Sequence, residues 1–200
     1  AAGIVPVAHA SDGGGSIRIP ASATGLVGHK PSRGLVSAAP GADGPGLNTN
    51  GVVTRDVRDS AAFLDVLSRY QPGDPWLRKR PQTTYVDACD RDPGALRVGL
   101  LWEPLNGEES DLHPHSREAV ELTARTLESL GHHVEIAPRP MNSADWETFM
   151  PLWATTAAQL PVPEEAVEML EPLTRWLREM GEQFTAVDFA NAVAGMHTLT

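Results

Sequence analysis

The residues with the clearest chemical potential are Gly13-Gly14-Gly15-Ser16, three consecutive glycines that end on a serine. A glycine run loses much backbone entropy on folding, so it is typical of a main chain that takes unusual φ/ψ values or lets another group approach closely. Successive N–H groups of such a turn can converge on an anion or on a developing oxyanion. With a hydroxyl beside these donors, the stretch is suited to acyl transfer, in which a nucleophile attacks a carbonyl carbon.

Other interpretations of this stretch stay open at the level of local chemistry, since a glycine-rich turn is often only a turn. It is not a Walker loop, because no Gly-Lys-Ser/Thr follows, and its glycine spacing is not that of a dinucleotide-binding fingerprint. It also differs from the Gly-x-Ser-x-Gly nucleophile elbow, because Ile17-Arg18 follow the serine. A phosphate-binding α/β domain is a further alternative, as the same N–H groups would suit a phosphate.

The longer stretch around this serine, Ser-Asp-Gly-Gly-Gly-Ser-Ile-Arg-Ile-Pro-Ala-Ser at residues 11–22, resembles the second half of the amidase signature. The resemblance continues through Gly25–Gly34 and Val52–Asp59, and so covers the first third of the chain. It implies a serine amide hydrolase with an α/β fold, in which a mixed sheet is flanked by helices. Only part of that fold is expected in this chain.

The resemblance assigns roles residue by residue. Ser16 corresponds to the nucleophile that forms the acyl ester. The oxyanion hole corresponds to the main-chain N–H groups of Gly13, Gly14, Gly15 and Ser16. Asp12 and Arg18 flank the nucleophile, and an ion pair between them would hold the loop in shape. The resemblance implies no metal and no cofactor, because a lysine deprotonates the nucleophile through a bridging cis-serine.

The sequence departs from the family pattern at the base. The lysine and the bridging serine lie upstream of this stretch in the family and are absent here; Lys30 belongs to a downstream Gly-x-Lys-Pro motif and Lys79 to a charged loop, so neither is assigned the role. We therefore expect the 200 residues to be an internal piece of a protein more than twice as long, and to hydrolyse nothing alone. At Gly13, His29 and Leu35 the residue also differs from the usual one in the family, and these differences concern the choice of substrate.

The subclass has two enzymatic alternatives and one that is not enzymatic. The match looks closer to stand-alone amidases, including those that act on aminohexanoate oligomers. The alternative is a glutamyl-tRNA amidotransferase subunit, which needs a partner subunit and tRNA and usually has Gln where Ile19 stands. A non-catalytic remnant, which kept the signature after losing its base, is the third.

Composition limits the partners. The net charge of −10 argues against nucleic acid and against anionic membrane surfaces, and no apolar run is long enough to span a membrane. The single cysteine, Cys89, suits a reducing cytoplasm. The expected partner is a small-molecule amide, with a homodimer as an open option. The acidic residues after residue 80 are best explained as solvated helix faces rather than a site for a cation.

Four segments are expected to position the serine. Ile4–His9 reads as a strand that leads into the glycine loop, with His9 packed or partly exposed rather than catalytic. The small residues 21–28 suit a helix or turn that packs tightly behind the loop. Residues 31–51 form a long loop that either lines the substrate site or is plain surface. Asp59-Ser60 would cap a helix whose core face is expected to hold Ala62, Phe63, Val66 and Leu67.

The whole chain is expected to be one part of a single amidase domain, with the signature core at 1–70, a connector at 71–95, a strand-helix-strand at 96–137 and a helical region at 140–200. The strands are Leu96–Leu101 and Val134–Ile136, and the helix between them, His115–Leu130, ends at Gly131.

Large apolar groups at helical spacing in the last region predict core packing. Because the family uses this region to shape its acyl cavity, Phe149 and Trp153 are expected to line the substrate site. Four histidines flank the 115–130 helix, at 113, 115, 132 and 133, but its length keeps the two pairs too far apart to share a metal ion.

Overall fold

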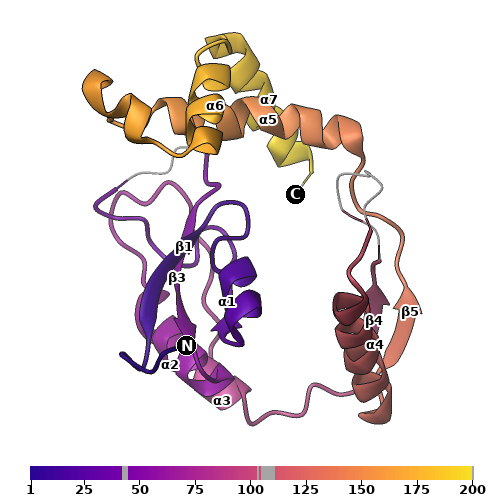
Figure 1. The fold of residues 1–200 in the computed structure, drawn as a ribbon. Coiled ribbons are helices and arrows are strands. Elements are labelled where there is room, and N and C mark those ends of the chain that lie inside the picture. The colour runs from indigo at the N-terminus through magenta and orange to yellow at the C-terminus, as the bar shows by residue number, and fades with distance from the viewer. Residues whose placement is uncertain (42–44, 103, 105–110, 200) are drawn as a thin grey trace. The chain divides into compact units, whose positions relative to one another are not determined.

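The computed structural model describes residues 1–41, 45–102, 104 and 111–199, and these are the described residues below. They form two compact units, Ala1–Asp92 and Pro93–Thr200 (Figure 1). The boundary falls within the stretch 71–95 that the sequence marks as a connector. Antiparallel strands, a parallel strand pair and helices all occur, which confirms the expected α/β class.

The sheet of the first unit has the order β1-β3-β2, with strands Ala8–Asp12, Thr49–Thr54 and Val27–Gly28. Strand β3 pairs antiparallel with both neighbours, and Asp12 lies opposite Thr49 at the end of the first pair. The predicted start of β1 was wrong: Ile4 and Val5 are 88% and 53% exposed and lie outside the strand. Proline has no N–H to donate to a ladder, so Pro6 delays the strand until Ala8.

Helix α1 (Arg18–Thr24) packs behind the glycine loop, as the small residues of this segment predicted. It ends at Gly25, whose φ of 67° is in the left-handed region that favours glycine. Ala21 is 2% exposed, and a Cβ added to Gly28 of β2 would lie 2.5 Å from the Cβ of Ala21 and 2.7 Å from the carbonyl oxygen of Ile17. Glycine at 28 therefore allows β2 to approach the helix.

Helix α2 (Val57–Leu67) begins two residues before the predicted cap. Asp56 is the N-cap, and its carboxylate accepts a hydrogen bond from Asp59 N–H at 2.9 Å. The predicted core face was also wrong, because Phe63 and Val66 are 37% and 59% exposed. The buried positions are Ser60, Ala61 and Leu64. The helix carries two apolar stripes one position apart, and periodicity alone does not say which one the sheet covers.

The short helix α3 (Tyr85–Ala88) is attached to α2 by side-chain hydrogen bonds. Asp65 accepts from the N–H groups of Tyr85 and Val86 at 2.8 and 3.1 Å, and Thr84 caps the helix by accepting from Asp87 N–H.

The long segment at 31–51 has no helix or strand among its described residues before β3 begins at Thr49. It packs against the connector: Ser37 donates to Asp74 at 2.6 Å, and the guanidinium of Arg33 lies 5.3 Å from the ring centre of Trp76.

The second unit begins with the predicted strand-helix-strand. Strands β4 (Arg97–Leu100) and β5 (His133–Ile136) pair in parallel, and helix α4 (Pro114–Ser129) connects them. Gly131, at φ 89°, ends the helix as predicted, and the bonds from His132 N–H to Leu127 and from Gly131 N–H to Glu128 complete a Schellman motif.

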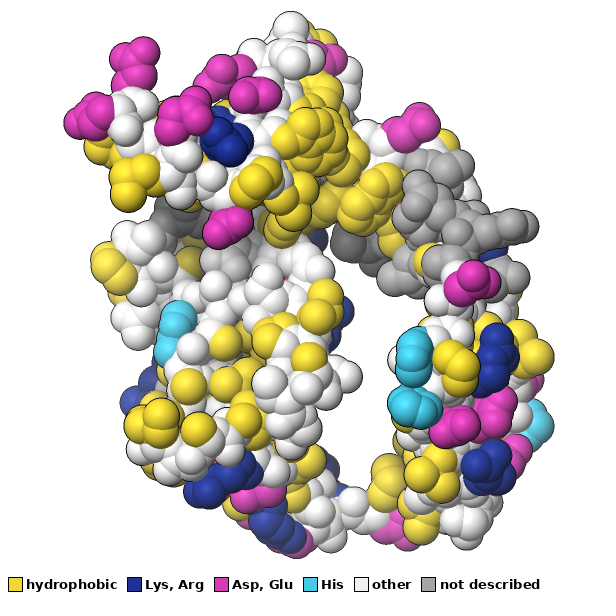
Figure 2. All heavy atoms as spheres, in the orientation of Figure 1, with side chains coloured by type: hydrophobic (Ala, Val, Ile, Leu, Met, Phe, Trp, Pro, Cys, Tyr) yellow, Lys and Arg dark blue, Asp and Glu magenta, His cyan; other side chains and the backbone are white. Residues whose placement is uncertain are grey.

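The remainder is helical, as expected: α5 (Ser143–Ala158), the 3₁₀ turn η1 (Glu164–Met169), α6 (Pro172–Gly181) and α7 (Ala186–Thr198). Helix α5 packs against both α6 and α7. Leu152 and Ala154 are fully buried, whereas Trp146, Leu173 and Trp176 are 43%, 65% and 49% exposed, so core packing was predicted too widely. Figure 2 shows apolar side chains gathered on the surface of these helices. No helix in the described ranges is long and apolar enough to cross a membrane.

Candidate active site: the glycine loop and Ser16

The glycine loop connects the end of β1 at Asp12 to the start of α1 at Arg18. Gly15 is buried with φ at 120°, a conformation that residues with a Cβ rarely adopt. A Cβ added there would lie 2.5 Å from Cδ1 of Ile19. The bond from Ile19 N–H to the Gly15 carbonyl, at 2.8 Å, starts the helical turn that follows. The backbone conformation therefore favours glycine at 15, whereas the contact can be relieved by a rotamer change of Ile19, which is 66% exposed.

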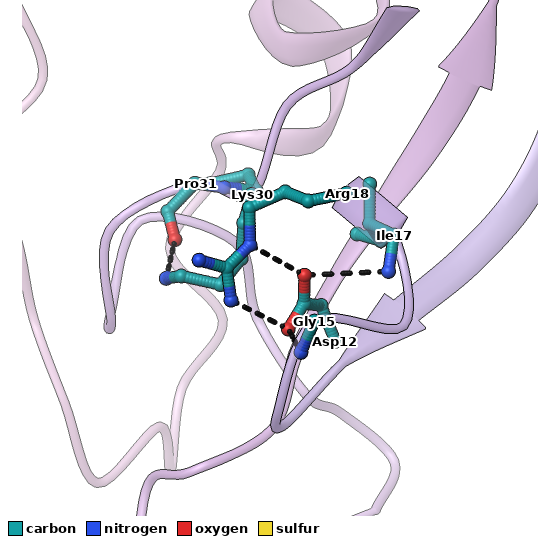
Figure 3. Close-up of polar contacts among 6 residues, drawn as sticks. All are labelled: Asp12, Gly15, Ile17, Arg18, Lys30 and Pro31. Carbon is teal, nitrogen blue, oxygen red and sulfur yellow. Dashed lines mark hydrogen bonds and ion pairs between the residues drawn. The ribbon is translucent and has the colours of Figure 1, made fainter. Parts of the chain in front are cut away.

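Asp12 fixes the shape of this loop. Its side chain is fully buried, and its two oxygens accept from Gly15 N–H at 2.6 Å and from Ile17 N–H at 3.3 Å. Arg18 adds two donors, Nε at 2.8 Å and Nη2 at 3.0 Å (Figure 3). The predicted ion pair of Asp12 and Arg18 is present, and the carboxylate also holds two amides on either side of Ser16.

The charge of Asp12 follows from these contacts. The hydrogen bond from Arg18 holds the pKa of the carboxyl far below its ordinary value, against the burial that would raise it, and the bonds from Gly15 and Ile17 lower it further. The same pairing raises the pKa of Arg18. Both groups are therefore charged at neutral pH, and the carboxylate has its oxygens occupied by donors.

Ser16 is exposed, although Gly15 and Ile17 on either side of it are buried. The N–H groups of Gly13, Gly14 and Ser16 donate to no acceptor among the described residues, whereas Gly15 N–H is committed to Asp12. The four amides predicted for an oxyanion hole are thus not equivalent in this arrangement. The N–H groups of Gly13, Gly14 and Ser16 are the ones that could bind a ligand oxygen without displacing the carboxylate.

Lys30 lies near this network, a proximity that the sequence analysis did not predict. It is half-buried, and its Nζ donates to the carbonyl oxygen of Pro31 at 2.7 Å (Figure 3). Desolvation lowers the pKa of Lys30, and the positive charge of Arg18 lowers it further. The Gly-x-Lys-Pro motif was the only sequence feature that singled out this lysine. Its position near Arg18 depends on the packing of β2 against α1, which the sequence does not show.

The other residues that the sequence analysis considered lie on other elements. His9 is exposed at the second position of β1, opposite Val52, and its lack of a catalytic role stays a prediction. Phe149 and Trp153 lie on α5 of the second unit, where the Phe149 ring centre is 5.8 Å from that of Trp153. Their place in a substrate cavity stays a prediction.

The four histidines have local structural contacts. His113 caps α4 by accepting from His115 N–H at 3.3 Å, and His132 accepts from Leu96 N–H at 3.2 Å. His133 lies 3.6 Å from Glu135. Within the described ranges no three histidine, cysteine or acidic side chains gather in a way that could hold a metal ion.

Comparison with known proteins gives a consistent result. The family model described as Amidase matches residues 1–196. The 6-aminohexanoate-cyclic-dimer hydrolase of Pseudomonas sp. (strain NK87) is 40% identical over 141 residues, which are 68% of this chain and 28% of that protein. A relative from Synechocystis sp. is 36% identical over all of this chain, which spans 38% of that protein.

The solved structure of 6-aminohexanoate cyclic dimer hydrolase with substrate matches with a TM-score of 0.82 and 31% identity, over 97% of this chain and 43% of that one. A bacterial aryl acylamidase of the amidase signature family shares the fold, with a TM-score of 0.78. The chain therefore spans less than half the length of the relatives it matches, and its fold is the corresponding part of theirs. By its sequence and its fold, this chain belongs to the amidase family.

Proposed function

We propose that the protein of which these residues are part hydrolyses a carboxamide or a linear or cyclic amide through an acyl-Ser16 intermediate. One observation carries the proposal: Ser16 is exposed between two anchored residues, in a loop whose buried Asp12 fixes the neighbouring amides. Membership of the amidase family supports amide hydrolysis as the reaction.

The chemistry follows from the loop. Ser16 Oγ attacks the amide carbonyl, and the carbonyl oxygen takes up negative charge in the tetrahedral adduct. The N–H groups of Gly13, Gly14 and Ser16 are the proposed donors to that oxygen; Gly15 N–H stays with Asp12 and contributes by holding the turn. The adduct collapses as the proton removed from Ser16 is returned to the leaving nitrogen; the amine departs, and an ester stays on Ser16. Water then hydrolyses the ester, which releases the acid and restores the serine hydroxyl.

The proton from Ser16 needs an acceptor. Asp12 is unsuited to this role, because its pKa is far below the ordinary value and all its bonds hold the loop. Lys30 donates to Pro31, and the structure gives no contact between it and Ser16. The base is therefore proposed to be the lysine that the family resemblance implies, acting through a bridging serine, and both would come from outside residues 1–200. On this proposal the 200-residue chain alone hydrolyses no amide.

The relatives suggest where to begin with substrates. Two relatives, from Pseudomonas sp. (strain NK87) and Paenarthrobacter ureafaciens, are named 6-aminohexanoate-cyclic-dimer hydrolase. We propose amides of aliphatic acids, the 6-aminohexanoate cyclic dimer among them, as the first class to test, and Phe149 and Trp153 as cavity residues for the acyl group. The cytoplasm is the proposed compartment and a homodimer the proposed alternative to a monomer.

The test is a panel of amides with graded acyl length against the complete protein and two serine variants. Ser16→Ala should abolish hydrolysis of every amide that the unchanged protein cleaves. Ser22→Ala, an exposed serine on α1, is the matched control and should retain full activity. Hydrolysis by Ser16→Ala at the unchanged rate would contradict the proposed nucleophile. Measurable hydrolysis by the 200-residue chain alone would contradict the proposal that the base lies outside it.

A further inference from the structure

Ser16 lies in the helical turn that leads into α1. Two bonds of the i to i−4 type define this turn, from Ile19 N–H to the Gly15 carbonyl at 2.8 Å and from Ala21 N–H to the Ile17 carbonyl at 3.3 Å. Residues three positions apart on a helix are neighbours, with roughly 5–6 Å between their Cβ atoms. Ile19 is therefore next to Ser16 on one face of this turn.

The side chain of Ile19 is exposed and lies against the glycine loop. It is 66% exposed, although isoleucine is large and apolar. Its Cδ1 and Cγ1 atoms lie 2.5 and 3.0 Å from the position that a Cβ on Gly15 would take, so the side chain leans back towards the loop, as helical side chains do. Pro20, the neighbour of Ser16 at i+4, is also exposed. The surface beside Ser16 on the α1 side is therefore apolar.

The cation of the same turn is already paired. Arg18 donates Nε and Nη2 to the buried carboxylate of Asp12, at 2.8 and 3.0 Å. A substrate carboxylate at this position would have to compete with that carboxylate for the guanidinium. The turn therefore favours an apolar substrate group beside Ser16 over an anionic one.

The two substituents of an amide carbonyl have different needs beside this surface. The leaving nitrogen must receive a proton, so it needs polar groups within reach, and the proposed base comes from outside residues 1–200. Against an apolar side chain the nitrogen would lose its hydrogen bonds, whereas acyl carbons lose none. We propose that Ile19 is a specificity-determining residue, which contacts the first carbons of the acyl group and favours acyl groups that are apolar there.

This inference rests on the proposed acyl-Ser16 mechanism and narrows its substrates. An aliphatic acyl group has a methylene next to the carbonyl, whereas an α-amino acyl group carries an ammonium on that carbon. An ammonium placed against Ile19 is desolvated without a partner. The protein should therefore cleave an aliphatic amide with a higher kcat/KM than its α-amino derivative, by about tenfold or more, the usual discrimination of an apolar contact.

The test measures this preference in the complete protein and in Ile19→Thr, which keeps the β-branched shape and introduces a hydroxyl. The pair of substrates is the aliphatic amide that the unchanged protein cleaves best and its α-amino derivative. Their intrinsic reactivities cancel when the ratio of kcat/KM values is compared between variants. Ile19→Thr should reduce the ratio roughly fivefold. Ile19→Val, which removes one carbon, should shift it in the same direction by a smaller factor.

Ile4→Thr is the matched control and should leave the ratio unchanged. Ile4 is 88% exposed and precedes β1, whereas Ser16 follows that strand, so the length of a five-residue strand, roughly 15 Å, separates the two. A second pair of amides keeps the acyl group and varies the amine. Its ratio should be the same in Ile19→Thr and in the unchanged protein.

Three results would overturn the inference. An equal loss of kcat/KM for both members of the acyl pair would give Ile19 a structural role only. A larger change in the amine pair than in the acyl pair would place the leaving group against it. An unchanged acyl ratio would show that Ile19 does not contact the acyl group. If a fluorophosphonate still modifies Ser16 in the same samples, each of these results leaves the proposed nucleophile intact; if the adduct forms elsewhere, both proposals fail.

Discussion

The two units contain ion pairs of the same chemical type in opposite environments. In the glycine loop, the Asp12 side chain is 0% exposed and accepts from two backbone amides as well as from Arg18. In the strand pair of the second unit, Arg97 and Glu135 are 78% and 44% exposed and bond to each other across β4 and β5. The difference teaches that a carboxylate determines chain conformation when it also holds backbone donors, and otherwise adds little.

Replacing the buried carboxylate should have the largest effect on stability. Asp12→Asn keeps the shape but removes the charge that pairs with Arg18 and the symmetric acceptor for Gly15 and Ile17. We expect it to lower the free energy of unfolding by on the order of 2–3 kcal/mol, because the amide NH₂ would face N–H donors that the buried carboxylate now satisfies. Urea unfolding measures this. An effect no larger than that of Glu135→Gln would remove the distinction between the two pairs.

Replacing Gly15 in the turn should have the second-largest effect on stability. Gly15→Ala meets both a φ of 120° and a contact of 2.5 Å with Ile19, so we expect a loss of about 1–3 kcal/mol in unfolding free energy. Gly25→Ala is the matched control, since Gly25 has a φ of 67° with nothing within 4 Å of an added Cβ. Its left-handed conformation is one that residues with a Cβ adopt at lower cost, so this variant should lose less. Equal losses in the two variants would show that a φ of 120° at position 15 is no more costly for alanine than the left-handed conformation at position 25.

Lowering the pH should destabilise the unchanged protein more than Asp12→Asn. The pKa of Asp12 is lower in the folded chain than in the unfolded one, so the unfolded state binds more protons and stability rises with pH across this window. The contribution is complete above about pH 4, the ordinary value for Asp, and is lost as pH falls towards the folded pKa. Unfolding measured between about pH 2 and 6 should therefore show a steeper loss in the unchanged protein than in Asp12→Asn. Parallel curves would contradict this assignment.

The exposed pair should give the smallest effect. Arg97→Gln removes a side chain that is 78% exposed, and we expect the unfolding midpoint in urea to stay within measurement error. Added salt should not change the difference in unfolding midpoint between Arg97→Gln and the unchanged protein. A marked destabilisation would show that β4 and β5 depend on this contact, and would weaken the contrast with the glycine loop.

The same contrast explains what could be predicted from the sequence. The glycine run, the small residues behind it and the Asp12–Arg18 pair all follow from steric and electrostatic needs that few residues satisfy. The strand-helix-strand was also predictable, since the spacing of its apolar residues changes from that of a strand to that of a helix, and Gly131 marks the end of the helix.

The errors have a common physical origin. Helix α2 has two candidate apolar stripes, and the sheet selected the one with Ala61 and Leu64 rather than that with Phe63 and Val66. The start of β1 depended on pairing that Pro6 cannot make. Nor could the sequence show that Gly15 N–H is taken by Asp12, because that bond depends on three-dimensional placement of the carboxylate.

The central claim is that Ser16 makes the covalent bond. The most direct measurement is mass spectrometry of the complete protein after reaction with a fluorophosphonate, with the modified residue located by peptide sequencing. The account predicts one adduct per chain, on Ser16, that is lost in Ser16→Ala and kept in Ser22→Ala. An active protein whose adduct lies on another residue, or that forms the same adduct with alanine at position 16, would contradict it.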